Sequence, residues 1–440
     1  MSKRRNRVCG ADVHRDLIVA TILGEDEIPI REQFGTTHAE LERFRDWLIA
    51  NGCQQVAFEA TGVYWIPIYD VLSPSIDTIV ANPWMIKTIP NDKSDAKDSS
   101  RIASLCFNGQ IKRSRVFSED DRALRTMTRA RTGDIKTRTQ FRNRIHKYLA
   151  SDGIKLSSCI SSIFGKSGSH ILNGLVEEKS IGEILDGIPS GKIRKKRDLI
   201  KAALGNGLDE TNRLLIKDTL DVLDVLETKI AATSQRVLDK ILTRKTDLAI
   251  VMSIPGIGFV AGSVILSEIG DYRDFKTPGQ LAKWCGLSPG VNESAGKKRT
   301  CGITKQGSKY LRTVLVEIAH VVARMGDTRL SRSFRNMKGR KNYNVAITAL
   351  ARKIICLVHH LLVNQELYQE DDCDKRKSKP AKNECSSSSL PEENLEDKVA
   401  AIVDAFYRLN AHNRKGVPGD VLGGLPGPEF LSGKRFDGGG

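Results

Sequence analysis

Arg7-Val-Cys-Gly-Ala-Asp12 is a short apolar stretch that predicts a buried strand ending in a carboxylate. Gln55-Val-Ala-Phe-Glu59 follows the same pattern. In Lys93-Ser-Asp95-Ala-Lys-Asp98, a spacing of three residues places two more carboxylates on one face of a predicted helix. Carboxylates that converge on one pocket repel one another unless they stay protonated or bind a divalent cation. The pattern therefore indicates a site for Mg²⁺ or Mn²⁺, which prefer oxygen ligands, with the candidate ligands Asp12, Glu59, Asp95 and Asp98.

The alternative is coincidence, because the chain has 53 Asp and Glu residues from which four can be chosen. The order of the predicted elements favours the metal site. Alternating and periodic apolar residues predict three strands, a helix, a strand, a helix, a strand and a helix, at residues 8–12, 17–23, 28–34, from 38, 55–59, 65–72, 77–81 and from 95. Pro29 places the third strand at a sheet edge. We expect a small α/β domain here.

Length, charge and cysteine content limit the classes of protein that fit. The chain has 440 residues, enough for two or three domains, and its net charge of +16 favours a polyanionic partner. Nine cysteines without any Cys-x-x-Cys pair argue against a disulfide framework and a structural zinc site. We expect no apolar stretch long enough to span a bilayer, and no signal peptide. We expect a cytosolic protein.

Residues 111–150 hold twelve Lys or Arg against four Asp or Glu, a net charge of +8. A partial apolar stripe predicts a helix. Such a charge run is often only a solvated helix face, but this excess favours contact with nucleic-acid phosphates. Residues 151–207 suggest an insertion or a flexible connector without assigned chemistry. The candidate phosphate contacts in the basic segment are Arg113, Arg115, Arg125, Arg129 and Arg131.

Residues 209–250 predict a long helix with a near-heptad apolar seam, interrupted near Thr233. The seam can pack within the chain or pair two chains. Next, Ser253-Ile-Pro-Gly-Ile-Gly258 predicts a tight turn before a helix, resembling a helix-hairpin-helix loop. Exposed amides around Gly256 and Gly258 would bind phosphate there, and the alternative is an ordinary connecting turn.

Gly286-Leu-Ser-Pro289 predicts a turn, followed by an irregular basic loop and a helix that begins near Ser308. A serine hydroxyl that attacks a phosphodiester keeps the bond energy in a phosphoserine link, so the strand can be rejoined. Spacing leaves Ser288, Ser294 and Ser308 open as that serine. Basic side chains nearby could stabilise the transition state or bind phosphate, namely Lys297, Lys298, Arg299 and Lys305.

The motifs together resemble the DEDD insertion-sequence transposases of the IS110 family, with the Piv and MooV recombinases. The matching residues are Asp12, Glu59-Ala-Thr-Gly62, Asn82-Pro83, Lys93-x-Asp-x-x-Asp98 and the Gly-Leu-Ser-Pro turn, over residues 7–150 and 209–365. The resemblance implies a ribonuclease H-like fold of the RuvC branch, with the four acids as its metal site. It further implies that Ser294 is the nucleophile and that a coiled-coil arm joins protomers. A noncoding bridge RNA would guide the reaction.

The resulting fold class is α/β plus all-α. We expect a RuvC-like catalytic domain at 1–118, a basic helix, connector and coiled-coil arm at 119–250, a C-terminal transposase domain at 251–368 and a disordered tail at 369–440. The expected partners are donor DNA, target DNA, a guide RNA and further copies in a homodimer or homotetramer, in the cytoplasm of a prokaryote. The alternatives are a metal-dependent junction nuclease without a covalent intermediate, and a non-catalytic nucleic-acid-binding protein.

Overall fold

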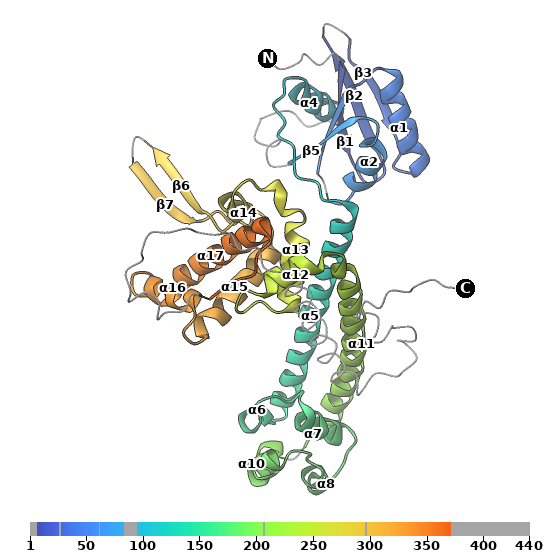
Figure 1. Ribbon diagram of the computed structural model, residues 1–440. Helices are drawn as coiled ribbons and strands as arrows, with labels where there is room; N and C mark the ends of the chain where they lie inside the picture. Colours follow the sequence, from blue (N-terminus) through green and yellow to red (C-terminus); the bar gives the residue numbers. More distant parts are fainter. Residues whose placement is uncertain are drawn as a thin grey trace, which may run out of the picture. The chain divides into compact units, whose positions relative to one another are not determined.

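The structure is a computed structural model that describes residues 7–25, 28–60, 62–82, 95–205, 207–294 and 297–370. The side chains of residues 95–97, 291–294 and 297–301 lie outside this description. The chain divides into two compact units, Met1–Phe117 and Ser118–Gly440, and each is described by itself (Figure 1). Nearly all of the predicted disordered tail falls outside the described residues.

The first unit contains the predicted order of strands and helices. Its elements are β1 (Arg7–Val13), β2 (Ile18–Gly24), β3 (Ile30–Phe34), α1 (His38–Ala50), β4 (Gln55–Glu59), α2 (Trp65–Leu72), β5 (Asp77–Ala81) and α4 (Asp95–Phe107). They form a mixed sheet of order β3-β2-β1-β4-β5, in which β1 pairs antiparallel with β2 and parallel with β4. β3 is an edge strand, as Pro29 predicts.

Strand alternation divides the side chains of this sheet between two apolar layers. One face, with Cys9, Ala11 and Phe58, packs in the cluster that contains buried residues of α1 and α2. The other face, with Val8 and Ala57, packs in a cluster with Ile102 and Cys106 of α4. The sheet is therefore covered on both faces, and among the described residues the helical members of the second cluster come from α4.

The second unit contains a two-helix arm made of α5 (Glu119–Ser151) and α11 (Glu210–Ile241). Lys240 near the end of α11 pairs with Asp120 at the start of α5, and Asn212 bonds Asp152 at the other end with a nitrogen–oxygen distance of 2.6 Å. The helices are therefore antiparallel, and the apolar seam of α11 packs within the chain. Thr233, where the apolar seam is interrupted, is buried inside α11, and the single helix predicted over residues 209–250 is divided at Leu242–Arg244.

Five short helices close the far end of this arm: α6 (Leu156–Cys159), α7 (Lys166–Val176), α8 (Ile181–Asp186), α9 (Gly191–Arg194) and α10 (Arg197–Leu204). Their apolar side chains form a core of their own with Ile145 and Leu149 of α5 and Ile216 of α11. We call residues 152–207 the arm tip. The structure replaces the flexible-connector interpretation with a packed helical subdomain, because these short apolar pieces bury one another.

The remaining elements are η1 (Leu242–Arg244), α12 (Lys245–Met252), α13 (Phe259–Ile269), η2 (Tyr272–Asp274), α14 (Pro278–Trp284), β6 (Pro289–Ser294), β7 (Lys297–Ile303), α15 (Lys309–Arg324), α16 (Arg329–Lys338) and α17 (Tyr343–Asn364). All but η1 and β6 of the remaining elements contribute described residues to one apolar core. By length and composition α17 could cross a membrane, so the expectation that no stretch is long and apolar enough is wrong. Its residues Leu350, Ile354 and Val358 are buried in this core. A buried central helix of a globular protein can be as long and as apolar as a membrane-spanning helix.

Candidate active site and nucleic-acid interface

Asp12 and Glu59 lie at the carboxyl ends of two neighbouring parallel strands. Ala11 of β1 is the register partner of Phe58 of β4, and the two acids follow directly. Because side chains alternate along a strand, Asp12 shares the face of Gly10, and Glu59 shares the face of Ala57. Both carboxylates therefore project on the side of the sheet that α4 covers.

The direction of α4 brings its first turn to the same end of the sheet. Near its last turn, Cys106 Sγ lies 3.3 Å from Oε1 of Gln55 at the start of β4. Further toward its beginning, Ser99 Oγ lies 2.8 Å from Oγ1 of Thr21, the register partner of Gly10. The helix therefore runs from the strand ends that carry Asp12 and Glu59 toward the start of β4. Its first turn, with Asp95 and Asp98, lies toward those strand ends.

Asp12 is partly enclosed at its strand end. Its side chain is 18% exposed, and its Oδ2 lies 3.1 Å from Nε2 of His14. Among the described residues there is no group of three or more His, Cys, Asp or Glu side chains that could hold a metal ion. The side chain of Asp95 lies outside that part of the chain. The four-carboxylate ligand set therefore stays a prediction, although its donor chemistry suits a hard divalent cation.

Ser294 is the last residue of β6, opposite Lys297 of β7. The register continues with Glu293 opposite Lys298 and Asn292 opposite Arg299. The predicted irregular loop is therefore wrong, because the segment forms a two-stranded antiparallel hairpin joined through residues 295–296. This geometry places the backbone of Ser294 at the free end of the hairpin, and its side chain lies outside the described part.

The base of this hairpin is fixed to the end of α14. The backbone N–H of Thr304 donates to the Ser288 carbonyl at 3.0 Å, and that of Lys305 donates to the Gly286 carbonyl at 3.2 Å. Gly307 has a φ of +109°, and a Cβ there would lie 1.8 Å from the carbonyl oxygen of Trp284. Only glycine fits this approach, so the chain that leaves the hairpin is held against α14. Lys305 itself is exposed at this base.

Ser308 follows directly and has a structural role. It is the N-cap of α15, where its Oγ accepts from the N–H of Leu311, and it donates to Oε2 of Glu268 at 2.8 Å. The residue is only 8% exposed. A buried hydroxyl with two bonds is poorly placed to attack a phosphodiester. The geometry therefore disfavours Ser308 as the nucleophile, without excluding Ser288.

Glu268 of α13 is the most completely enclosed charge near the hairpin, with a fully buried side chain. Arg125 Nε lies 3.0 Å from Oε2, while Arg129 contacts both oxygens at 2.6 and 3.0 Å. Burial by itself would raise the pKa of Glu268, but the bonds from Arg129 and Ser308 and the charge of Arg125 together lower it. A single carboxylate thus connects α5, α13 and the start of α15.

The five arginines predicted to bind phosphate all have partners within the chain. Arg113 pairs with Asp77, and Arg115 stacks over Phe117 with its guanidinium carbon 4.7 Å from the ring centre. Arg131 Nε donates to Ser234 Oγ at 2.7 Å. Arg125 and Arg129 bind Glu268, as described above. These contacts give each arginine a role in packing, and their contact with nucleic acid stays a prediction.

The predicted turn between two helices is present between α12 and α13. Gly256 has a φ of +87°, and a Cβ there would lie 2.8 Å from Cγ2 of Val322, so glycine is needed for both conformation and space. Gly258 is the N-cap of α13, and a Cβ built on it would have no described heavy atom within 4 Å. Phosphate binding at this turn stays a prediction.

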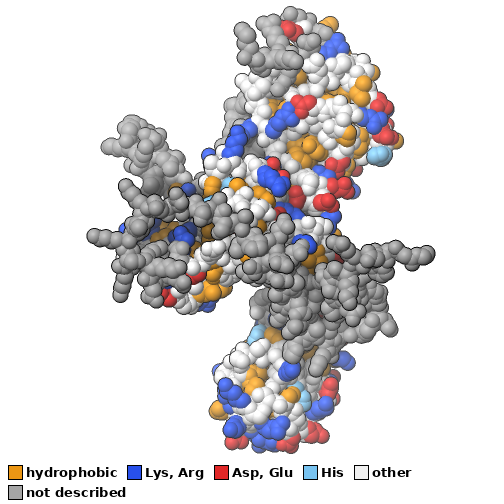
Figure 2. Space-filling model, in the orientation of Figure 1, with side chains coloured by type: hydrophobic (Ala, Val, Ile, Leu, Met, Phe, Trp, Pro, Cys, Tyr) orange, Lys and Arg blue, Asp and Glu red, His pale blue; other side chains and the backbone are white. Residues whose placement is uncertain are grey.

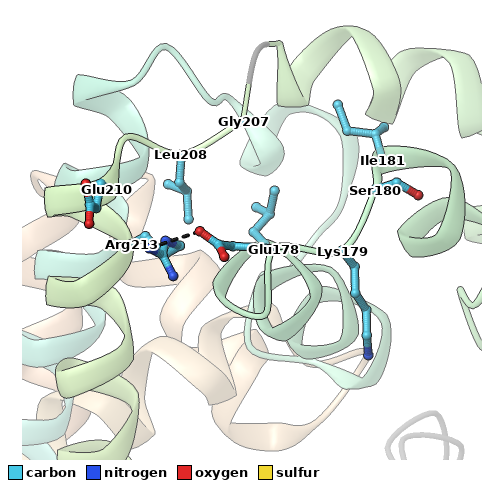
Figure 3. Close-up of a pocket in the computed structure, with 9 residues that line it drawn as sticks. Glu178, Lys179, Ser180, Ile181, Gly207, Leu208, Glu210 and Arg213 are labelled. Atoms are coloured by element: carbon cyan, nitrogen blue, oxygen red, sulfur yellow. Dashed lines mark ion pairs between the residues drawn. The ribbon is translucent and has the colours of Figure 1, made fainter.

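A separate pocket of about 550 Å³ opens in the arm tip, where the α7–α8 connection faces the start of α11 (Figure 3). Arg213 Nη2 crosses it to Oε1 of Glu178 at 2.9 Å. None of the predicted site residues lines it. The lining residues are Leu175, Glu178, Lys179, Ser180, Ile181, Gly207, Leu208, Glu210 and Arg213.

Two family models match the chain, one through the end of α5 and one from α12 onward. Residues 9–151 match the DEDD transposase model of IS110, described as "Transposase", and residues 248–335 match "Transposase IS116/IS110/IS902 family". Together these segments make up more than half of the 440 residues. The chain belongs to the IS110 family of transposases. The sequence resemblance is thereby confirmed at the level of the family.

Curated relatives of this transposase carry the same description. A "Probable family 20 transposase" of Pseudomonas aeruginosa is 26% identical over 321 residues, which cover 71% of this chain and 85% of the relative. The "Transposase for insertion sequence element IS1111A" of Coxiella burnetii is 23% identical over 330 residues, covering 72% and 79%. The "Transposase for insertion sequence element IS1328" of Yersinia enterocolitica is 23% identical over 269 residues, covering 60% and 70%.

Sequence reasoning missed two residues of this region in the transposase. Glu268 gave no signal, because one acid in an apolar helix says nothing about arginines 139 and 143 positions away. Tyr310, the second residue of α15, has the cationic groups of Arg129, Lys309 and Lys136 at 4.7, 5.5 and 5.8 Å from its ring centre. This aromatic ring lies among cations near the base of the β6–β7 hairpin, which we call the serine hairpin. These cations come from α5 and α15, and they form a basic surface because the fold brings the two helices together.

Proposed function

We propose that this insertion-sequence transposase cleaves and exchanges DNA strands by attack of Ser294 on a phosphodiester, assisted by divalent ions at Asp12, Glu59, Asp95 and Asp98. The observation that carries the proposal is the convergence of β1, β4 and the start of α4 at one end of the sheet. The sheet order β3-β2-β1-β4-β5, with one antiparallel edge, supports a ribonuclease H-like domain of the RuvC kind.

In this mechanism the four carboxylates belong to the unit Met1–Phe117 and the serine nucleophile belongs to the unit Ser118–Gly440. The hydroxyl oxygen of Ser294 forms a bond to phosphorus, the proton passes to a base, and the bond to one deoxyribose oxygen breaks, so that oxygen leaves and takes up a proton. A bound Mg²⁺ or Mn²⁺ would polarise the phosphate and lower the pKa of the hydroxyl. Lys297, Lys298 and Arg299, on the paired strand β7, would neutralise the charge of the transition state. Reversal of the attack by another strand end completes the exchange.

The proposed partners follow from the same chemistry. Donor and target DNA are the substrates of a transposase, and basic side chains around the hairpin and the α12–α13 turn would bind their phosphates. We include a noncoding bridge RNA and a homodimer or homotetramer in the proposal, since the family resemblance implies both. Because the substrate is chromosomal DNA, the reaction would take place in the cytoplasm, on the nucleoid of a prokaryote.

The test uses purified protein, Mg²⁺, candidate guide RNA and labelled element-junction DNA, quenched in denaturant and separated on a gel. We expect a DNA band shifted by covalently attached protein for the wild type and for Ser288→Ala, which removes a serine at the base of the same hairpin. We expect no such band for Ser294→Ala or Asp98→Asn, because the first lacks the nucleophile and the second a metal ligand.

Two other results would overturn this proposal. Cleaved but unattached DNA that persists with Ser294→Ala would instead support a metal-dependent junction nuclease, which hydrolyses the bond without a serine. Binding without any cleavage by the wild type, in Mg²⁺ and in Mn²⁺, would support a non-catalytic nucleic-acid-binding protein.

A further inference from the structure

The arm tip, residues 152–207, lies between the two segments that match the family models. Its packed core of short helices makes it a defined subdomain at the end of α5 and α11 (Figure 1). From Arg129, which binds Glu268, to Leu149, which enters the tip core, α5 advances by about 30 Å. The tip therefore extends well beyond the serine hairpin and its base.

Basic side chains concentrate in one short part of this subdomain. Residues 191–201 contain six Lys or Arg and one acid, Asp198. The lower end of the molecule in Figure 2, where Figure 1 places α8 and α10, carries a group of Lys and Arg side chains. Asp and Glu side chains also lie at this end in Figure 2, so the positive excess belongs to residues 191–201, where six cations and one acid give a net charge of +5.

Three of these six cations hold the tip together. Arg194 donates to the Ile188 carbonyl at 2.7 Å, Lys196 Nζ donates to the Cys159 carbonyl at 2.9 Å, and Arg197 pairs with Asp186. They bond backbone carbonyls and a carboxylate, and they join the segment from α9 to α10 to α6 and to the end of α8. These contacts within the fold offset part of the positive charge of the three side chains.

The other three cations have no such role. Lys192, Lys195 and Lys201 are exposed, and their side chains make no ion pair or hydrogen bond to any residue that the structure describes. Of the nearby acids, Asp186 pairs with Arg197, whereas Asp198 lies three residues from both Lys195 and Lys201 and offsets one positive charge. The three lysines, which we call the tip lysines, therefore present a net charge of +2 together with Asp198 on a packed subdomain.

Duplex DNA fits this surface better than single-stranded nucleic acid. Proteins that bind single strands stack bases on aromatic side chains. Phe164 is the only Phe, Tyr or Trp in residues 152–207, and its ring already packs on His146 and Arg142, with centroid distances of 5.7 and 5.0 Å. Lysines without an aromatic platform suit the regularly spaced phosphates of a duplex.

We propose that the tip lysines Lys192, Lys195 and Lys201 bind the phosphate backbone of duplex DNA away from the reacting phosphodiester. The proposal rests on the proposed action of the chain on DNA, but its test requires binding alone. Each phosphate contact releases condensed counterions, so it adds about 0.9 to the slope of log affinity against log salt concentration.

The experiment measures binding of the full chain to labelled element-junction duplex over a salt series, without divalent metal. We expect the triple variant Lys192→Gln, Lys195→Gln, Lys201→Gln to bind more weakly and to reduce the magnitude of the salt slope by about 3. The control is Lys155→Gln, Lys166→Gln, Lys217→Gln, which removes the same charge from exposed lysines before α6, on α7 and on α11 that make no ion pair with a described residue. It should leave the slope within about 1 of the wild type.

An unchanged slope for the tip variant, or an equal loss for both triple variants, would overturn the proposal. So would a loss seen only with candidate guide RNA in place of the duplex, since that result would assign the tip lysines to RNA. Because no strand is cleaved here, the outcome is independent of the covalent-adduct test of Ser294.

Discussion

Replacing Glu268 with alanine should destabilise the unit Ser118–Gly440 by about 3 to 5 kcal/mol, because removing one partner of a buried ion pair leaves the other charges uncompensated. Arg125 and Arg129 would each lose their carboxylate, and Ser308 would lose the acceptor of its hydroxyl. These bonds join α5, α13 and α15 to one another. We therefore expect the change to loosen the attachment of the hairpin that carries Ser294.

The matched control for this variant is Glu227→Ala. Glu227 of α11 also binds two arginines, Arg138 and Arg142, at 2.9 and 2.8 Å, but its side chain is 43% exposed. Solvent screens such a pair, so its loss should cost about 1 kcal/mol or less. Hydrogen exchange of the full chain would measure the protection of α13 and α15 in both variants. Equal protection of α13 and α15 in Glu268→Ala and in the wild type would contradict the prediction.

Acidification should have the same effect in the wild type through protonation of Glu268. Its pKa in the folded chain is lower than the ordinary value of 4.5, so the carboxylate stabilises the folded state above that value. The stabilisation is lost as the pH falls through the folded pKa, where the unfolded chain is already protonated. Glu268→Gln lacks this ionisation, so its unfolding free energy should fall less than that of the wild type between neutral pH and about pH 3. If the unfolding free energies of Glu268→Gln and of the wild type fell by the same amount, the assignment of this pH dependence to Glu268 would be wrong.

Features that depend on neighbouring residues, such as single strands and helices, could be predicted from the sequence. The short apolar runs at residues 8–12 and 55–59 predicted the strands and their terminal acids, and Pro29 predicted the edge strand. The heptad seam of α11 predicted a helix but left its partner open, and the structure pairs it with α5 through contacts such as Lys229 to Asp134 at 2.9 Å. Partners this distant in sequence have no local signal.

The errors have the same physical origin. The single helix predicted over residues 209–250 is divided at Leu242–Arg244 into α11 and α12, and α12 packs in the core shared with α13 to α17. Pairing across residues 295–296 makes strands of a segment whose polar and basic composition indicated a loop. The charge run of α5 indicated a phosphate surface, but its arginines also serve Glu268, Ser234 and Glu227, which the sequence places 85 to 143 residues away. Charge alone does not say which partner a side chain meets.

Gly10→Ala should destabilise the first unit by about 3 kcal/mol and move α4 off the sheet. A Cβ on Gly10 would lie 2.1 Å from the backbone nitrogen of Ala103 and 2.3 Å from the carbonyl oxygen of Ser99. Both atoms belong to the backbone of α4, so no side-chain rotation can relieve the overlap. Cys106 and Ile102 would lose burial against β1 and β4 as the helix moves away.

The functional consequence of this displacement reaches beyond stability. Asp98 lies on α4, whereas Asp12 and Glu59 lie on the strands, so in the proposed metal site the distance between helix and sheet would determine whether the carboxylates share an ion. Gly35→Ala is the control in the same unit, since a Cβ there meets only the flexible side chain of Glu40 at 3.2 Å. We expect Gly10→Ala, but not Gly35→Ala, to lose hydrogen-exchange protection in β1 and α4 and to abolish Mg²⁺-dependent adduct formation. Wild-type protection and adduct formation in Gly10→Ala would show that α4 need not contact the sheet this closely for the carboxylates to act together.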